Sequence, residues 1–297
     1  MILVTGASGF LGQAVCQHLN QQQQAYRTLP SRIGADLRWP ATLPPHLVGV
    51  ETVIHLAYPG TDGIGTALTS MADLVHDQLL IDLHTIDACA RSKVRVVCVG
   101  SVCAYPEHAP IPATEQHLWN GRPEYWNEPY GQAKRMGLSL LEVYRRQYGL
   151  ESTYLILGNL YGPGDTSGHV IPATIRKLRE GEAAGAPSIS VWGTGRATRE
   201  FLFVEDAAAA IVRAVECPPQ QEPINIVTGE EVSLADLVGM LANRVGYTGQ
   251  IVWDPSKPDG QPRRQFSYAR ARRILGWAPM VTLPQGLDRT VAEGNTR

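Results

Sequence analysis

A tyrosine and a lysine four residues apart, Tyr130 and Lys134, form the pair of side chains with the clearest capacity for proton transfer. Residues at this spacing lie on one face of a helix, which places the phenol beside the ammonium group. A neighbouring positive charge favours phenolate, so we expect Lys134 to lower the pKa of Tyr130 from its ordinary value of about 10. Most Tyr-x-x-x-Lys pairs are structural, and the surrounding sequence decides between the two interpretations.

A glycine-rich segment near the N-terminus follows an apolar run at residues 2–5 and opens a predicted helix. Backbone amides at a helix N-terminus bind phosphate groups, and glycines let a pyrophosphate approach closely. The spacing is Gly-x-x-Gly-x-x-Gly rather than the Gly-x-Gly-x-x-Gly of the usual dinucleotide fingerprint, so the position between strand and helix carries the interpretation. The segment that predicts a dinucleotide site reads Gly6-Ala7-Ser8-Gly9-Phe10-Leu11-Gly12.

The residues beyond this loop favour one cofactor. NAD sites usually carry an acid on the ribose about 20 residues further on, whereas this chain offers Arg27, Ser31 and Arg32, which suit a 2′-phosphate. We therefore expect NADP(H); the alternative is that these residues are solvated parts of a loop. Asp36 is placed either near the adenine or on the surface.

Two further polar residues follow a buried apolar run at residues 94–99, namely Ser101 and Cys103. The carboxyl ends of parallel strands form the edge at which open α/β sheets bind ligands. We expect the Ser101 hydroxyl and the Cys103 thiol to point into the pocket that holds Tyr130. His55, at the end of another apolar run, is expected to have a structural role at the sheet edge.

The elements that position these residues alternate in type along the chain. Short β-branched runs at residues 2–5, 53–56, 94–99 and 152–157 are separated by amphipathic stretches at residues 10–21, 67–90 and 130–148. Strands that alternate with helices form βαβ units and a parallel sheet. The predicted fold class is α/β, with a doubly wound parallel sheet of the Rossmann type.

After residue 157 glycine and proline punctuate the chain, which indicates a second, smaller α/β domain. Residues 201–215 and 224–227 again have the pattern of a helix and a buried strand. We predict an NADP-binding Rossmann domain at residues 1–160, rejoined by about 200–229, and a mainly substrate-binding domain at residues 161–297.

Composition excludes several classes of protein. With 297 residues, 44% hydrophobic and 18% charged, the chain is an ordinary globular protein with a large core. A net charge of -2 without a basic run gives no reason to expect nucleic acid as a partner. The odd number of cysteines, five, without paired ligand spacing predicts reduced thiols and no metal site. We expect a cytoplasmic enzyme with no membrane span.

The glycine loop, Ser101 and the Tyr130–Lys134 pair together resemble the extended short-chain dehydrogenase/reductases. The likeness implies that these three side chains form a catalytic triad and that Lys134 also holds the nicotinamide ribose. The stretch at residues 100–106 lacks the Asp-Glu pair of the sugar-nucleotide 4,6-dehydratases, because Val102 and Cys103 stand there. It closely resembles the GDP-L-fucose synthase family, the GDP-4-keto-6-deoxy-mannose 3,5-epimerase-4-reductases. The likeness runs from about residue 94 to 287 through segments 127–130, 159–165, 169–173, 191–195, 199–202 and 257–260.

This resemblance implies a two-step reaction on a nucleotide-diphosphate sugar. Cys103 and His169 are expected to exchange the protons at C3 and C5, which the 4-keto group acidifies. NADPH then supplies a hydride to C4, while Tyr130 protonates the oxygen and Ser101 hydrogen-bonds it. Without the resemblance, Cys103 is a small buried apolar residue and His169 a loop histidine.

The likeness also assigns binding residues. A guanidinium suits a diphosphate, so Arg199 is the first candidate for the substrate. The other predicted substrate contacts are Lys177, Trp192, Lys257 and Asp259. The predicted NADP(H) contacts are Gly6, Ser8, Gly9, Phe10, Leu11, Gly12, Arg32, Asp36, Leu56, Ala57 and Lys134.

Two departures from the family pattern border the sugar pocket: altered residues at 57–65 and a shortened stretch at 166–168. They leave open a 4-reductase or an epimerase acting on a different 4-keto nucleotide sugar. A non-enzymatic NADP sensor is a further alternative, although such relatives typically lose the tyrosine and lysine kept here. The superfamily likeness implies a homodimer. A stripe on the helix at 130–148 has the spacing for pairing or for facing the sheet, and consists of Ala133, Gly137, Leu140, Leu141 and Tyr144.

Overall fold

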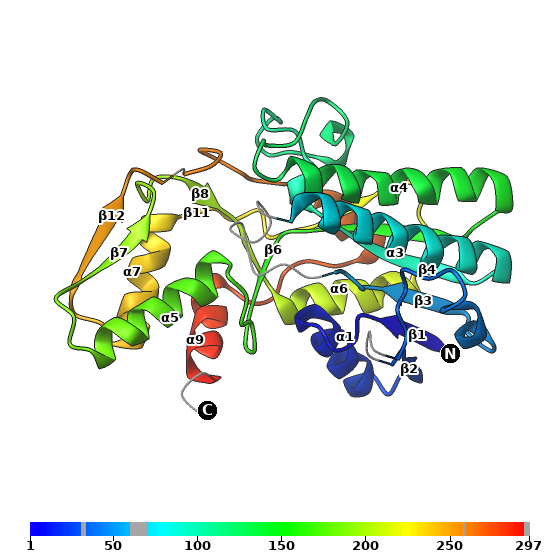
Figure 1. The fold of residues 1–297 in the computed structure, drawn as a ribbon, viewed down its shortest axis with the longest axis horizontal. Coiled ribbons are helices and arrows are strands. Elements are labelled where there is room, and N and C mark those ends of the chain that lie inside the picture. The colour runs from blue at the N-terminus through cyan, green and yellow to red at the C-terminus, as the bar shows by residue number, and fades with distance from the viewer. Residues whose placement is uncertain (31–33, 60–69, 258, 294–297) are drawn as a thin grey trace.

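A parallel sheet lies at the centre of the computed structural model, which describes residues 1–30, 34–59, 70–257 and 259–293 (Figure 1). Its six strands follow the order β10-β5-β4-β3-β1-β2, and every neighbouring pair is parallel. The strands are β1 (Ile2–Thr5), β2 (Tyr26–Thr28), β3 (Thr52–His55), β4 (Arg95–Ser101), β5 (Ser152–Leu157) and β10 (Ile224–Ile226). Five of them are largely apolar runs, as is typical of strands buried on both faces, whereas the edge strand β2 is short, polar and partly exposed.

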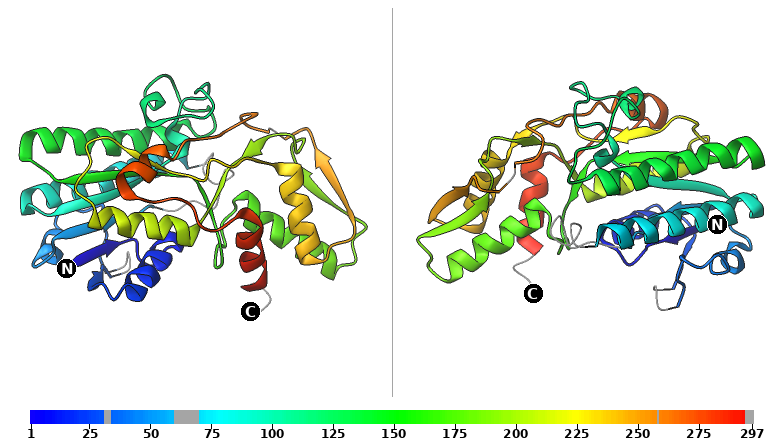
Figure 2. Two further views of the ribbon diagram at one scale, coloured as in Figure 1. Left: turned by 180° about the vertical axis from the view of Figure 1, so that it is seen from behind. Right: turned by 45° about the horizontal axis from the view of Figure 1, so that its top comes forward.

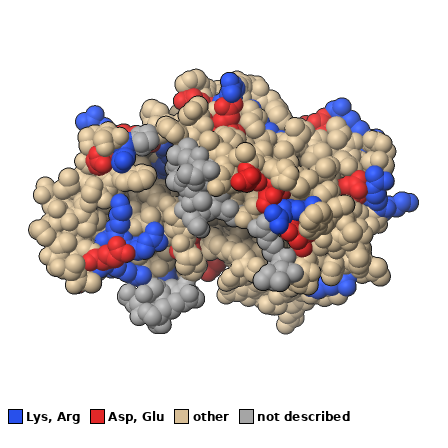
Figure 3. All heavy atoms as spheres, viewed as in Figure 1, with Lys and Arg blue, Asp and Glu red and all other residues tan. Residues whose placement is uncertain are grey.

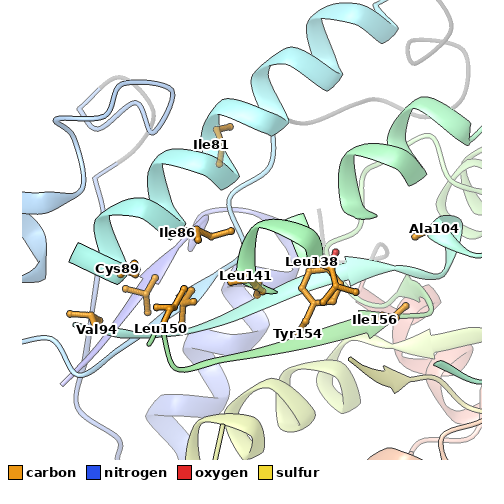
Figure 4. Packing of buried hydrophobic residues seen from close by; sticks show 14 of the residues in the cluster. Ile81, Ile86, Cys89, Val94, Ala104, Leu138, Leu141, Leu150, Tyr154 and Ile156 are labelled. Carbon is orange, nitrogen blue, oxygen red and sulfur yellow. The ribbon is translucent and has the colours of Figure 1, made fainter. Parts of the chain in front are cut away.

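Helices cover both faces of this sheet. Alternate residues of the strands pack into two separate cores, because successive side chains of a strand point to opposite faces. One core lies under α3 (Met71–Ser92) and α4 (Glu128–Tyr148), where Ile86, Leu141 and Tyr154 meet (Figure 4). The other lies under α1 (Phe10–Gln21) and α6 (Val204–Glu216), with α8 (Ala269–Leu275) beside it. The sheet and these helices are called the first lobe below.

A second lobe surrounds a third, smaller core. It contains α5 (Val170–Ala183), α7 (Leu234–Val245) and α9 (Leu283–Glu293), with the parallel pair β7 (Ser188–Trp192) and β12 (Gln250–Asp254). Two short pairs connect the lobes: β6 (Asn159–Tyr161) with β9 (Phe201–Phe203), and β8 (Thr198–Arg199) with β11 (Val232–Ser233). Short 3-10 helices are η1 (Pro44–Leu47), η2 (Val102–Ala104) and η3 (Glu115–His117). Both views of Figure 2 show the chain passing between the lobes more than once.

The predicted α/β doubly wound fold with a smaller second lobe is confirmed. Its boundaries differ in places: α3 runs to Ser92, and the expected helix from residue 201 begins at Val204 because β9 precedes it. β10 pairs with β5 and extends the sheet. The exact domain limits of 1–160, 200–229 and 161–297 stay a prediction.

The surface carries charges of both signs. On the face drawn in Figure 3, acidic and basic side chains alternate in small groups. Within the described ranges no helix is long and apolar enough to cross a membrane. The same ranges contain no group of three or more His, Cys, Asp or Glu side chains arranged to hold a metal ion.

Candidate active site

The glycine-rich loop turns from β1 into α1 directly against the end of β3. Gly6 has a φ of 68°, and a Cβ there would stand 2.7 Å from the Ala57 nitrogen. A Cβ on Gly12 would stand 2.1 Å from the Gly6 oxygen, so both positions require glycine. The loop, the first turn of α1 and the predicted contacts Leu56 and Ala57 therefore form one small region.

This region fits a dinucleotide. Ser8 and Gly9 are exposed, and the first amides of α1 have no partner within their helix. Gln13 donates from Nε2 to the Ser8 oxygen at 2.9 Å and so ties the first turn of α1 to the loop. Backbone donors at the start of a helix bind phosphate groups, so the loop fits a pyrophosphate.

The residues expected near the adenine end of the cofactor have partners within the protein. Arg27, on β2, donates to the carbonyls of His46 and Val48, so its guanidinium supports the η1 segment. Asp36 accepts from Arg38 Nε at 3.0 Å, and Arg38 also reaches Asp77 at 2.9 Å. Ser31 and Arg32 lie outside the described residues, so the predicted contact of Arg32 with a 2′-phosphate stays a prediction.

Four predicted catalytic residues meet at the carboxyl edge of the sheet; we call them the sheet-edge set: Ser101, Cys103, Tyr130 and Lys134. Ser101 ends β4, and its hydroxyl caps η2 by accepting from the Cys103 nitrogen at 3.2 Å. Tyr130 stands in the first turn of α4 and shares a hydrogen bond with Ser101. The Lys134 Nζ lies 5.8 Å from the centroid of the Tyr130 ring. The set has the composition needed for proton transfer to a carbonyl oxygen.

The pKa of the Tyr130 phenol shifts in the direction opposite to the one expected from the charge of Lys134. Burial raises the pKa of Tyr130 well above its ordinary value; Tyr58 and Cys103 add to the rise, and the Ser101 hydrogen bond opposes it. Burial also lowers the pKa of Lys134. Desolvation disfavours both charged forms, so it outweighs the attraction between them. A neutral phenol is the form that donates a proton.

Neighbouring backbone and rings fix the two helical members. The Tyr154 hydroxyl donates to the Lys134 carbonyl at 2.6 Å, and Arg135 Nε donates to the Ala104 carbonyl at 2.7 Å, which ties α4 to β5 and η2. Tyr58 packs edge-on against Tyr130, with ring centroids 5.6 Å apart. These contacts fix the Tyr130 ring and the backbone of α4 around Lys134.

His169, the fifth predicted catalytic residue, lies in the second lobe. It is exposed, and it precedes the first turn of α5 in the second lobe, with its backbone nitrogen 3.3 Å from the Ser167 hydroxyl. Its proposed pairing with Cys103 stays a prediction. The segment 60–65, where the sequence departs from the family, lies outside the described residues.

Four of the five predicted substrate contacts lie in two segments, residues 192–199 and 257–262, called the distal loops, and the fifth, Lys177, lies on α5. Trp192 is 58% exposed, and the Lys257 Nζ lies 5.6 Å above its ring. The Asp259 carboxylate accepts from the backbone nitrogen and the hydroxyl of Thr194, each at 2.6 Å. Lys177 donates to the Ser190 carbonyl at 3.2 Å and thereby supports β7.

Arg199 joins the distal loops to each other. Its guanidinium donates to the carbonyls of Thr198 at 2.7 Å, Gln261 at 2.6 Å and Asp259 at 3.0 Å. Burial and the nearby Arg264 lower the pKa of Arg199 to about 10, and Cys103 is among the groups that act against this. The predicted contact of Arg199 with a diphosphate stays a prediction; in the structure the side chain braces the loops beside the thiol.

Several residues near the site carry no signal in the sequence. Tyr58 and Glu124 lie in loops, and Asp82 reads as one polar residue among many on an ordinary helix. Glu124 is 8% exposed and accepts from Asn127 Nδ2 at 2.7 Å. Arg264 donates to the Val102 carbonyl at 3.0 Å. Their burial results from tertiary packing, which a single sequence does not display.

Comparisons with known proteins agree with this geometry. A model of the NAD dependent epimerase/dehydratase family matches residues 2–227. The GDP-L-fucose synthase of Escherichia coli (strain K12) is 34% identical over 304 residues, covering 97% of this chain and 94% of that protein. A GDP-L-fucose synthetase from Naegleria fowleri bound to NADP superposes with a TM-score of 0.88 at 26% identity, covering 99% of this chain and 94% of the other. A GDP-6-OMe-4-keto-L-xylo-heptose reductase from C. jejuni gives a TM-score of 0.90 at 26% identity, with 99% and 97% covered.

Proposed function

Since the chain belongs to the NAD dependent epimerase/dehydratase family, we propose that it is an NADPH-dependent epimerase-reductase that converts GDP-4-keto-6-deoxy-mannose to GDP-L-fucose. One observation carries the proposal: Ser101, Cys103, Tyr130 and Lys134 converge at the carboxyl edge of the sheet, next to the glycine loop. A reductase needs the phenol and the lysine, and an epimerase needs a further base. The thiol of Cys103 supplies that base in the same pocket.

Each residue has a separate role in the proposed epimerisation and reduction. When bound, NADPH supplies the hydride for C4. Tyr130, held neutral by burial, donates its proton to the oxygen at C4, and Ser101 hydrogen-bonds the same oxygen. At each carbon beside the carbonyl, one of Cys103 and His169 removes the proton from one face of the sugar and the other returns a proton to the opposite face, so that the configuration inverts. Arg199 and the distal loops hold the diphosphate end of the substrate.

Deuterium exchange tests the two steps separately. The protein is incubated with GDP-4-keto-6-deoxy-mannose in heavy water, first without and then with NADPH, while NMR follows C3 and C5 and absorbance follows NADPH. We expect exchange at both carbons without cofactor, then GDP-L-fucose with it. Cys103→Ser should reduce the exchange by about 100-fold or more, because a hydroxyl is a much weaker base.

Cys217→Ser is the matched control, because that thiol lies against the Ile274 carbonyl, away from the sheet-edge set. It should leave exchange and reduction unchanged. If neither step occurs with the wild-type protein, this substrate is wrong.

A second candidate is a 4-reductase that acts on another 4-keto nucleotide sugar without epimerisation. The exposed position of His169 favours it, as does the likeness to the C. jejuni heptose reductase. NADPH consumption with no deuterium at C3 or C5 selects this candidate. A panel of 4-keto sugar nucleotides then ranks the substrates by kcat/KM.

We also propose a cytoplasmic homodimer, with residues 1–160 and 200–229 holding the cofactor and 161–297 mainly the substrate. All cysteines of the chain are free thiols, which suits a reducing compartment. The stripe that begins at Ala133 faces inward, whereas Met136 and Val143 are 49% and 51% exposed on the outer face of α4. Light scattering should give twice the chain mass, and Met136→Lys combined with Val143→Lys should give a monomer.

A further inference from the structure

A buried polar cluster lies near Lys134, between α3 and the adjacent strands β1 and β3. We call it the Asp82 cluster; its members are Thr5, His55, Gln78 and Asp82, with exposures of 0%, 4%, 0% and 6%. Thr5 Oγ1 lies 2.8 Å from His55 Nδ1, and His55 Nε2 lies 3.1 Å from Asp82 Oδ1. Gln78 Nε2 donates to the same oxygen at 2.6 Å. The reaction steps described above use none of these residues.

The hydrogen bonds fix where the protons of the cluster reside. Thr5 Oγ1 accepts from the backbone nitrogens of Leu56 at 3.2 Å and Ala57 at 3.3 Å, so its own hydrogen is left for His55 Nδ1. His55 Nδ1 is thus an acceptor, and its Nε2 carries the hydrogen that Asp82 receives. The Asp82 carboxylate thus accepts hydrogen bonds from His55 and from Gln78.

The Asp82 carboxylate approaches α4 where that helix has no side chain. A Cβ on Gly137 would stand 3.0 Å from Asp82 Oδ2. Between the two helices and the sheet is a cavity of about 10 Å³, lined by Asp82, Lys134 and Cys98 among others. This is room for about one water molecule, which would have polar groups around it.

The groups that act on the Lys134 ammonium are buried in the layer between the sheet, α3 and α4. Burial lowers the pKa of Lys134, and Asp82 is the largest group acting against that change, followed by Cys98. Lys134 also faces the rings of Tyr58 and Tyr130, and it donates to the Val99 carbonyl at 3.4 Å.

On its other sides Asp82 faces Cys98 and Tyr154 as well as His55. Burial and Asp82 raise the pKa of the Cys98 thiol and of the Tyr154 phenol well above their ordinary values. Both groups are therefore neutral near pH 7, and Asp82 supplies the negative charge for this interior.

We propose that Asp82, held in place by His55 and Gln78, is the internal counter-charge that keeps the buried Lys134 ammonium protonated. Asp82 is a positioning residue that acts through Lys134. The inference depends on the proposed function only for the role of Lys134 in the reduction. The Asp82 cluster thus extends the sheet-edge set inward, from the pocket to the layer between α3 and α4.

The chain contains four lysines, Lys93, Lys134, Lys177 and Lys257, which allows a direct test on the protein without cofactor or substrate. Protein labelled with ¹³C at the lysine ε-carbons gives four NMR signals, and their shifts follow the charge of each amine. Lys134→Arg assigns the signal. In Asp82→Asn we expect the Lys134 midpoint to move down by about one pH unit, because an isosteric amide keeps both hydrogen bonds and removes the charge. The other three curves should stay in place.

Two matched variants separate charge from packing. Asp87→Asn makes the same change on the same helix, where Asp87 is paired with Arg91, and should move no Lys134 curve. His55→Gln keeps the carboxylate and should move it less than Asp82→Asn does. An unchanged midpoint in folded Asp82→Asn, or an equal movement in His55→Gln, overturns the proposal.

Activity gives the second measurement. If the wild type reduces a 4-keto sugar nucleotide, the loss of turnover on the alkaline side of the pH profile should begin about one pH unit lower in Asp82→Asn than in the wild type and in Asp87→Asn. A wild type inactive on every such sugar contradicts the proposed function, and the NMR titration still decides the role of Asp82.

Discussion

The sheet-edge set and the distal loops hold polar side chains in opposite ways. At the sheet edge, neighbouring backbone and rings fix the helix and the strand, and Ser101 acts on the pKa of Tyr130 by side-chain hydrogen bonding. In the distal loops the polar groups of Arg199 and Asp259 bond the backbone of the loops themselves. The proposed reactive groups are therefore held by the sheet and its helices, whereas the proposed recognition end depends on contacts between loops.

Tyr130→Phe should produce the largest effect, because it removes the proton donor of the sheet-edge set. We expect the rate of C4 reduction to fall by about 10³-fold, within the range for general acid catalysis, and the dissociation constant of NADPH to change by about threefold or less. Stopped-flow absorbance measures the first and fluorescence titration the second. Tyr144→Phe, on the same helix but bonded to Asp87, is the control and should reduce at the wild-type rate. A Tyr130→Phe enzyme of normal turnover would remove the distinction drawn between the two regions.

Glu200 lies between β8 and β9, directly after the first distal loop, and its titration should make stability depend on pH. Its carboxylate accepts from the backbone nitrogens of Phe266 at 2.5 Å and Gly229 at 3.0 Å. Burial raises its pKa to about 7, with the backbone hydrogen bonds acting against the rise. The folded state therefore binds more protons than the unfolded state between about pH 4.5 and 7, and stability falls as pH rises through that window.

The measurement is the free energy of unfolding in urea at pH 5 and pH 8. Relative to Glu200→Gln, which does not titrate, the wild type should lose about 2 kcal/mol between the two values. Parallel pH curves for the two proteins would contradict the assignment.

Arg199→Lys distinguishes a guanidinium that stabilises the distal loops from one that contacts the substrate. A single ammonium cannot reach all the carbonyls that Arg199 serves, so we expect about 1–2 kcal/mol of lost stability and a rise in KM of about tenfold or less. Arg196→Lys, an exposed neighbour, should change neither quantity. Unchanged stability with KM raised by about 100-fold would instead identify a direct diphosphate contact.

Lys257→Met should have the smallest effect on stability. The Lys257–Trp192 contact is exposed to water, where such a pair contributes about 0.5 kcal/mol. Thermal melting should show a Tm within about 2 °C of the wild type. A larger loss would mean that the distal loops depend on this contact rather than on Arg199.

Much of the first lobe could be predicted because its strands are continuous apolar runs with helical stretches between them. The short strand β9 could not, since Phe201–Phe203 continues directly into the apolar face of α6. The sheet-edge set was predictable because residue type and position after a strand carry its chemistry.

The Asp82 cluster and the raised pKa of Tyr130 were not predictable, because both result from burial. Asp82 and Gln78 look like ordinary polar residues on a helix until α4 packs over them at Gly137. The expected lowering of the Tyr130 pKa considered the charge of Lys134 and neglected the desolvation of both groups.

The path of the chain between the lobes has a mechanical consequence. After β6 the chain leaves the first lobe, returns for α6 and β10, leaves again for α7 and β12, and returns once more for α8 before ending in α9. No single cut by a protease frees either lobe, and a truncation before β10 leaves β5 as an unpaired edge prone to aggregation. Because several connections must bend together, the lobes are expected to close on a substrate by small sliding movements rather than by a wide swing about one hinge.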